Sequence, residues 1–145
     1  MICPLGLFTS KTGEWETPQD LFEKLNHIYH FNLDPCSTEL NHKCARYFTK
    51  ESDGLIQSWE GFRVFMNPPY GREIGAWVKK AFESKAEIVV CLLPARTDTN
   101  WFHSYIYGKA EINFLKGRLK FSKSKNSAPF PSMIVIYKFG RQNDS

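Results

Sequence analysis

Asn67, Pro68, Pro69 and Tyr70 stand together directly after a short apolar run at 64–66. This run has the composition of a buried strand. Proline has no N–H and a fixed φ, so two prolines in succession end the strand and stiffen the turn. An amide and an aromatic ring are thereby held at the carboxyl end of a strand, where open α/β sheets bind ligands. These residues are therefore the first candidates for chemistry.

The stretch resembles the Asn-Pro-Pro-Tyr motif of S-adenosylmethionine-dependent amino-methyltransferases, chiefly those that methylate N6 of adenine in DNA. The amine of adenine is a poor nucleophile because its lone pair is delocalised into the ring. The resemblance implies that the Asn67 amide oxygen and the Pro68 carbonyl accept from this amine, while Pro69 keeps the loop rigid and Tyr70 stacks on the base. The base must leave the duplex to reach such a pocket. Attack on a sulfonium methyl then needs in-line positioning more than a strong base.

Stretches upstream resemble the cofactor-binding motifs of the same enzymes. Thr17-Pro18 resembles their Thr-Pro motif, and we expect Thr17 to cap a helix whose amino end meets the cofactor carboxylate. Asp34 follows a strand predicted over 31–33, and Asp53 resembles the acid that accepts from the cofactor's adenine amine. The implied S-adenosylmethionine site comprises Trp15, Thr17, Pro18, Asp34, Pro35, Cys36, Asp53 and Asn67.

Segments downstream extend the resemblance. Residues 89–96 resemble the strand ending in Leu-Pro-Ala that follows the motif, and 117–121 and 128–132 match the compact phage-type adenine-N6 methyltransferases, the Dam family. The resemblance runs from about residue 14 to residue 139. It implies that Phe121 or Phe130 packs against the flipped base, and a core position for both rings is the alternative.

The net charge of +4 and the pI near 8.9 are only mildly basic, but the cations are unevenly distributed. Five of them lie between residues 116 and 125 without an acid: Lys116, Arg118, Lys120, Lys123 and Lys125. Such a run is usually a solvated face. Beside an amino-methyltransferase motif, we interpret it as a patch that follows the phosphates of double-stranded DNA.

The elements that position these residues alternate between strand and helix. Helices are predicted over 18–29, 73–84 and 98–107, with a short one near 38–46; strands are predicted over 31–33, 63–66, 88–93, 111–121 (one or two) and 133–139. This order predicts an α/β fold with helices on both faces of a mostly parallel sheet. The resemblance implies a Rossmann-like methyltransferase three-layer αβα sandwich with an antiparallel C-terminal strand.

Length and composition predict one globular domain over 1–145, with an irregular lead-in at 1–13 and no separate target-recognition domain. We expect no membrane span and no signal peptide, because apolar runs are short and the amino end lacks a charged start. Four irregularly spaced cysteines favour reduced thiols in the cytoplasm of a bacterial or phage-infected cell. A domain of this size covers little DNA alone, which is compatible with a homodimer.

Two other functions stay open at this point. The same motif serves enzymes that methylate RNA or a glutamine side chain in a protein, because an amide nitrogen poses the same lone-pair problem. A methyltransferase-like module that binds DNA and turns over slowly is the other alternative. No metal is expected, because His30, Cys36, His42 and Cys44 match no common zinc-ligand spacing.

Overall fold

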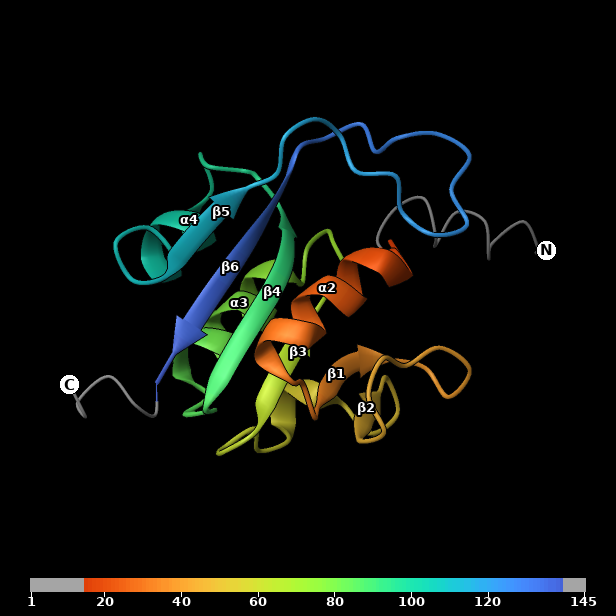
Figure 1. Cartoon of the computed structure of the whole chain (residues 1–145). Coiled ribbons are helices and arrows are strands. Elements are labelled where there is room, and N and C mark those ends of the chain that lie inside the picture. Colours follow the sequence, from red (N-terminus) through yellow and green to blue (C-terminus); the bar gives the residue numbers. More distant parts are fainter. Residues whose placement is uncertain (1–14, 140–145) are drawn as a thin grey trace.

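The computed structural model describes residues 15–139, and over this range the chain has a mixed α/β architecture (Figure 1). The described part contains three α-helices, six strands and one short 3-10 helix. The irregular lead-in expected at 1–13 lies outside the described residues. No helix within the described range has the length and apolar composition needed to cross a membrane.

Four strands form the main sheet, in the order β3 (Arg63–Met66), β4 (Ile88–Pro94), β6 (Ser132–Lys138) and β5 (Glu111–Phe114). β3 and β4 are parallel, whereas β6 is antiparallel to both of its neighbours. Accordingly β3, β4 and β5 share one direction and β6 runs against them. The expected antiparallel C-terminal strand is present. The sheet is nevertheless mixed, where a mostly parallel one was expected, because β6 inserts between β4 and β5.

A smaller sheet pairs β1 (Asp34–Ser37) with β2 (Tyr47–Thr49) in parallel. Leu33, just before β1, forms a single parallel bridge to Val64, and its carbonyl accepts from the Phe65 N–H at 3.0 Å. β1 and β2 therefore run in the same direction as β3 and lie beside it.

Two predictions in this region are wrong. The strand predicted over 31–33 with a turn after it is a strand beginning at Asp34, whose N–H donates to the carbonyl of Arg46 at 3.1 Å. The short helix predicted near 38–46 is absent. Thr38 and Asn41 exchange two backbone hydrogen bonds of 3.2 Å, and the Asn41 N–H also reaches the Thr38 hydroxyl at 3.0 Å. This local side-chain bonding closes a turn in competition with a helix.

Helix α2 (Gln19–Tyr29) packs on one face of the main sheet. The ring centroid of Phe22 lies 5.2 Å from that of Phe65, at an interplanar angle of 78°. The helix begins one residue later than predicted, with Pro18 at the N-cap position and no side-chain cap. The prediction that Thr17 caps this helix is therefore wrong; its hydroxyl has another partner, described below.

Helices α3 (Ile74–Glu83) and α4 (Asn100–Tyr105) lie on the opposite face. The ring centroids of Tyr137 in β6 and Phe82 in α3 lie 6.2 Å apart. The Tyr137 hydroxyl donates to the Tyr105 carbonyl at 2.6 Å. The register aligns Phe65 with Ile136 across β4, so the next residue, Tyr137, points to the other face. Figure 1 shows this arrangement, with α2 in front of the sheet and α3 behind it.

The 3-10 helix η1 (Gly54–Ile56) follows β2 and packs closely against β1. A Cβ added at Gly54 would collide with the carbonyl oxygen of Pro35 and come within 3.1 Å of Cη2 of Trp77. The Trp59 indole N–H donates to the Gly54 carbonyl at 3.0 Å, which holds the close approach from the other side. Only glycine fits this position without a shift of the backbone.

We predict that Gly54→Ala lowers the free energy of unfolding by about 1–3 kcal/mol, the usual cost of overpacking. Gly75→Ala is the matched control, because its new Cβ would meet Trp101 only at ordinary contact distances of 3.6 Å. That variant should be neutral or slightly stabilising. Urea denaturation monitored by circular dichroism measures both. Equal stability of the two variants would contradict the close packing of η1 on β1.

Candidate active site

Asn67 lies at the carboxyl end of β3, and its side chain is fixed by two hydrogen bonds. The amide Nδ2 donates to the carbonyl of Trp15 at 2.6 Å and to the hydroxyl of Thr17 at 2.8 Å. A carbonyl can only accept, so the nitrogen must face Trp15 and the amide orientation is unambiguous. The oxygen Oδ1 consequently faces away from both partners.

Oδ1 of Asn67 is buried and has no hydrogen-bond partner among the described residues. A buried acceptor without a partner costs about 1–3 kcal/mol. Such groups are rare in folded proteins, and one at the carboxyl edge of a sheet suits a site that a ligand donor completes. The arrangement presents an acceptor in a fixed direction.

Four aromatic side chains pack together at the Asn-Pro-Pro-Tyr loop, and we refer to them below as the aromatic cluster. They are Trp15, Tyr70, Phe121 and Phe130. The Trp15 ring lies 5.4 Å from Phe121 and 5.3 Å from Phe130, and Tyr70 is 6.3 Å and 5.7 Å from the same two rings. These separations and the tilted or edge-on angles are the preferred geometry of aromatic pairs. The cluster links the amino-terminal segment, the Asn-Pro-Pro-Tyr loop and the chain before β6.

Members of the aromatic cluster differ in accessibility. Tyr70 and Phe121 are buried, whereas Trp15 and Phe130 are half-buried. The Tyr70 hydroxyl donates to the Leu92 carbonyl at 3.0 Å, and burial raises its pKa well above the usual range, so the phenol stays neutral. Phe121 and Phe130, the two rings predicted to pack against the flipped base, both lie beside Tyr70. The buried position of Phe121 is also what a core aromatic would have.

The segment that carries Trp15 and Thr17 is itself held by the chain before β6. Glu16 and Ser122 form an antiparallel bridge, in which the Ser122 N–H donates to the Glu16 carbonyl at 3.0 Å. The Ser122 hydroxyl donates to the Thr17 carbonyl at 3.2 Å. Lys123 adds an ion pair with Glu16 at 3.4 Å. These contacts anchor both partners of the Asn67 amide.

Asp34 is buried, and both carboxylate oxygens are engaged by its own loop. Oδ1 accepts from the Cys36 N–H at 3.2 Å and Oδ2 from the Lys43 N–H at 2.8 Å. Burial raises the pKa of Asp34, and the two backbone hydrogen bonds oppose this shift. Its neighbour Pro35 is buried against Gly54, so the immediate role of this stretch is to organise the loop after β1.

Asp53 is the more available carboxylate. It is half-buried, its backbone is left-handed with φ of 58°, and its Oδ1 accepts from the Leu55 N–H at 3.1 Å. Burial and the charge of Asp34 raise the pKa of the Cys36 thiol, and the charge of Cys36 is a minor cause of the raised pKa of Tyr70. The fold thus brings the β1 residues and the Asn-Pro-Pro-Tyr loop together.

The basic stretch lies on the loop between β5 and β6, and all five of its cations are exposed. Lys116, Arg118 and Lys120 line a cavity of about 310 Å³ with α2, whereas Lys123 pairs with Glu16 and Lys125 lies outside that cavity.

Residues 7–144 match the sequence model of the DNA N-6-adenine-methyltransferase (Dam) family. The chain belongs to this family. It is 27% identical over 133 residues to the DNA N-6-adenine-methyltransferase of Haemophilus phage HP1, a match that covers 85% of the chain and 77% of the relative. It is 32% identical over 109 residues to the protein of the same name from Escherichia phage T1, covering 72% of the chain and 45% of that relative. The family makes the chain a DNA adenine methyltransferase.

Two residues that sequence reasoning missed, Ser122 and Arg96, lie at the candidate active site of this adenine methyltransferase. Ser122 holds the segment 15–17, and the guanidinium of Arg96 lies 5.9 Å from the Phe130 ring and lowers the pKa of Tyr70, against the larger effect of burial. Arg96 follows directly on β4 at the same sheet edge as Asn67, a position that would have identified it. Nothing local in the sequence identifies Ser122.

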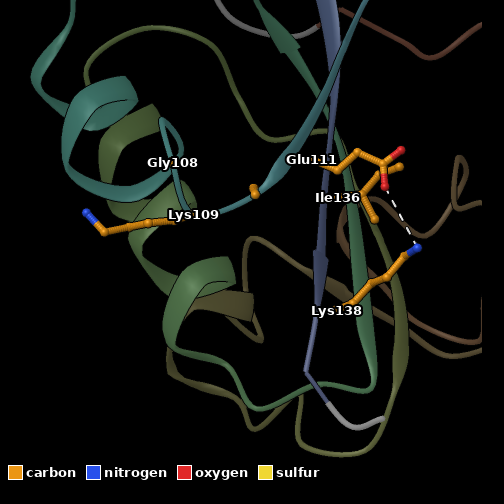
Figure 2. Close-up of a pocket in the computed structure, with 6 residues that line it drawn as sticks. Gly108, Lys109, Glu111, Ile136 and Lys138 are labelled. Carbon is orange, nitrogen blue, oxygen red and sulfur yellow. Dashed lines mark ion pairs between the residues drawn. The ribbon is translucent and has the colours of Figure 1, made fainter. Parts of the chain in front are cut away.

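A second cavity, of about 480 Å³, lies at the opposite end of the parallel strands. Figure 2 shows Gly108, Lys109, Glu111, Ile136 and Lys138 around it, with Glu111 and Lys138 paired at 3.8 Å. Lys138 is in register with Ile88 at the start of β4, so this cavity is at the amino ends of the parallel strands. It is separate from the candidate active site, which lies at their carboxyl ends.

Within residues 15–139 no group of three or more His, Cys, Asp and Glu side chains is arranged to hold a metal ion. The described cysteines, Cys36, Cys44 and Cys91, are free, and Cys3 lies outside the described residues.

We predict that Asp34→Asn lowers the free energy of unfolding by about 1–3 kcal/mol, because the amide NH2 must face one of two backbone N–H donors. Thermal unfolding checks this, with the exposed Asp98→Asn as the matched control. Unchanged stability would show that the loop after β1 does not depend on this carboxylate.

The pH dependence of Asp34 has a defined sign. Its pKa in the folded protein is raised above 3.8, so the stabilisation from proton uptake is present at low pH and is lost as pH rises through the folded-state pKa. Asparagine does not titrate. The stability difference between wild type and Asp34→Asn should therefore widen as the pH falls from about 7 to about 4. A gap that narrows over this range would contradict the direction of the shift.

Proposed function

We propose that the protein transfers a methyl group from S-adenosylmethionine to N6 of an adenine in DNA that has been flipped out of the duplex. The observation that carries this proposal is the buried Asn67 Oδ1, an acceptor whose direction is fixed and which has no partner among the described residues. We further propose that the mixed sheet with helices on both faces is a compact form of the Rossmann-like methyltransferase three-layer sandwich.

The amine of adenine is the donor that Asn67 lacks. Acceptance of one N–H by Oδ1 and of the other by the Pro68 carbonyl would draw the nitrogen toward tetrahedral geometry and direct its lone pair. Pro69 restricts the backbone beyond Pro68, so the carbonyl is held in place before the base arrives. Because Nδ2 is already bonded to Trp15 and Thr17, the Asn67 side chain loses little conformational entropy when its oxygen accepts a hydrogen bond from the base.

The flipped base would lie against the aromatic cluster. Tyr70 is only 5% exposed, so most of the accessible aromatic surface for a base comes from the half-buried Trp15 and Phe130. Tyr70 and Phe121 support these two rings from behind in this arrangement. Stacking of this kind is tolerant of the base, and selection of adenine then depends on the Asn67 and Pro68 acceptors.

The residues around β1 and η1 suit S-adenosylmethionine, which supplies a methyl group on a sulfonium. Asp53 has the free acceptor capacity that a ribose hydroxyl or an adenine amine requires, because only its Oδ1 is bonded among the described residues. Asp34 shapes the loop instead, and Pro35 and Cys36 line the same region. Thr17 and Pro18 lie at the amino end of α2, where backbone N–H groups and the helix dipole favour a carboxylate.

Removal of the Asn67 amide should abolish most of the activity. We predict that Asn67→Ala reduces methyl transfer into unmethylated duplex DNA by roughly 100-fold or more, the scale of losing one fixed polar contact to the reacting group. Incorporation of tritium from labelled S-adenosylmethionine measures it. Asn113→Ala, the same change on the edge strand β5, is the control and should keep full activity. Full activity of Asn67→Ala would refute the catalytic role, and transfer to RNA or protein in place of DNA would refute the substrate.

Cofactor affinity distinguishes the two carboxylates. We predict that Asp53→Asn weakens binding of S-adenosylhomocysteine roughly tenfold, the loss of about 1.4 kcal/mol from a charge-assisted hydrogen bond. The asparagine oxygen can still accept from Leu55, so the turn should survive. Titration calorimetry measures the affinity, with Glu51→Gln, on the exposed turn before Asp53, as the control. A normal affinity in Asp53→Asn would move the cofactor contact elsewhere.

A further inference from the structure

The cavity of about 310 Å³ lies between the first half of α2 and the loop that leaves β5. Four cations line it: Lys24 from the helix, and Lys116, Arg118 and Lys120 from the loop. We call it the basic groove. Figure 1 shows the blue loop between β5 and β6 arching across to the amino-terminal end of α2, which is where the two sides of the groove meet.

Among the described residues, no ion pair neutralises the cations of the basic groove. Within residues 15–139, none of its four cationic side chains forms an ion pair or a hydrogen bond with another residue. The lining contains a single acid, Asp20, whose Oδ1 accepts from the Leu21 N–H at 2.8 Å at the start of the helix. Four cations against one carboxylate leave a concave surface of one sign, which attracts an anion.

Between the cations the groove is apolar. Leu21, Leu115 and Leu119 line it and are half-buried. A surface of this kind suits a phosphodiester with its deoxyribose, because the sugar packs on the leucines while the phosphate oxygens meet the cations. A free inorganic anion would make no use of the apolar part.

The basic groove adjoins the candidate active site through the chain itself. Lys120 precedes Phe121 of the aromatic cluster, and Asp20 stands three residues after Thr17, which bonds Asn67. A backbone phosphate in the groove would therefore belong to a nucleotide close to the target base. Lys123 and Lys125 differ, because Lys123 lies beyond the aromatic cluster with a left-handed backbone and pairs with Glu16, and neither lines the groove.

We propose that the basic groove binds DNA backbone phosphates beside the target adenine, with Lys24 of α2 as a DNA contact. The five cations of the loop then divide into a binding set, Lys116, Arg118 and Lys120, and a second set, Lys123 and Lys125, that contributes little to affinity. This inference rests on the proposed function for the position of the target base, and on the groove alone for its chemistry.

The salt dependence of DNA binding tests this division. Each phosphate contact contributes about −0.9 to the slope of log affinity against log salt. The double variant Lys24→Ala with Lys116→Ala should reduce the magnitude of the slope by about 1 to 2 and weaken binding about tenfold or more. The control, Lys79→Ala with Lys125→Ala, removes the same charge at two exposed positions outside the groove and should change neither value appreciably. Fluorescence anisotropy with a labelled duplex and no cofactor measures both.

Asp20 provides a test with the opposite sign. Asp20→Asn removes the single acid of the groove lining, so duplex binding should strengthen several-fold at low salt and the effect should fade as salt rises. Equal losses in the two double variants, or no loss in the groove variant, would overturn the proposal. Deoxyadenosine monophosphate serves as a competitor. If it displaces the duplex from the wild-type protein and binds more weakly to the groove variant, the groove is a site for a free nucleotide, and the proposal is also overturned.

These readouts are independent of methyl transfer. A protein that binds DNA through the groove but transfers no methyl group would refute the proposed function and leave the groove intact. A protein that methylates DNA while the groove variant binds normally would refute the groove alone. Thermal unfolding of each variant shows that a loss of binding is not a loss of fold.

Discussion

The hydrogen bonds of the Asn67 side chain connect the parts of the structure that form the candidate active site. Its amide nitrogen is bonded to the Trp15 carbonyl at 2.6 Å and to the Thr17 hydroxyl at 2.8 Å, so one side chain fixes the path of a distant segment across the sheet edge. The same bonds determine which way the amide oxygen points. The segment is in turn held by Ser122, which aligns the loop before β6 with the end of β3. An acceptor with a fixed direction exists here only because three remote stretches of chain are bonded together.

β3, β4 and β6 could be predicted because their apolar composition indicates buried strands. β4 is buried along its whole length, and the continuous apolar run at 88–93 predicted it within one residue. β1 and β2 could not be predicted in the same way. The strands have only four and three residues, β1 is largely polar, and their pairing depends on partners elsewhere, such as the Arg46 carbonyl and the bridge from Leu33 to Val64. The local pattern of residue types does not specify such tertiary contacts.

The same distinction applies to the site. Residue types identified Asn67, Tyr70 and the two acids, but they could not reveal how the hydrogen-bonding capacity of each group is used. Asp34 gives both oxygens to its own loop, whereas Asp53 keeps capacity for a ligand. Thr17 resembled a helix cap, and its hydroxyl instead accepts from Asn67 because Pro18 takes the N-cap position. Which donor meets which acceptor is decided by tertiary packing, and sequence motifs do not specify it.

The direction of β6 explains why the aromatic and basic residues reach the Asn-Pro-Pro-Tyr loop. β5 runs parallel to β3 and β4, so Phe114 ends at the carboxyl edge of the sheet, in register with Met133 and Leu93. β6 starts from that same edge and runs back between β4 and β5. The connection 115–131 must therefore begin and end on the side of the sheet where Asn67 lies, and it has enough length to cross to α2. The antiparallel strand that makes this sheet mixed is thus what places Phe121, Phe130 and the basic groove beside the candidate active site.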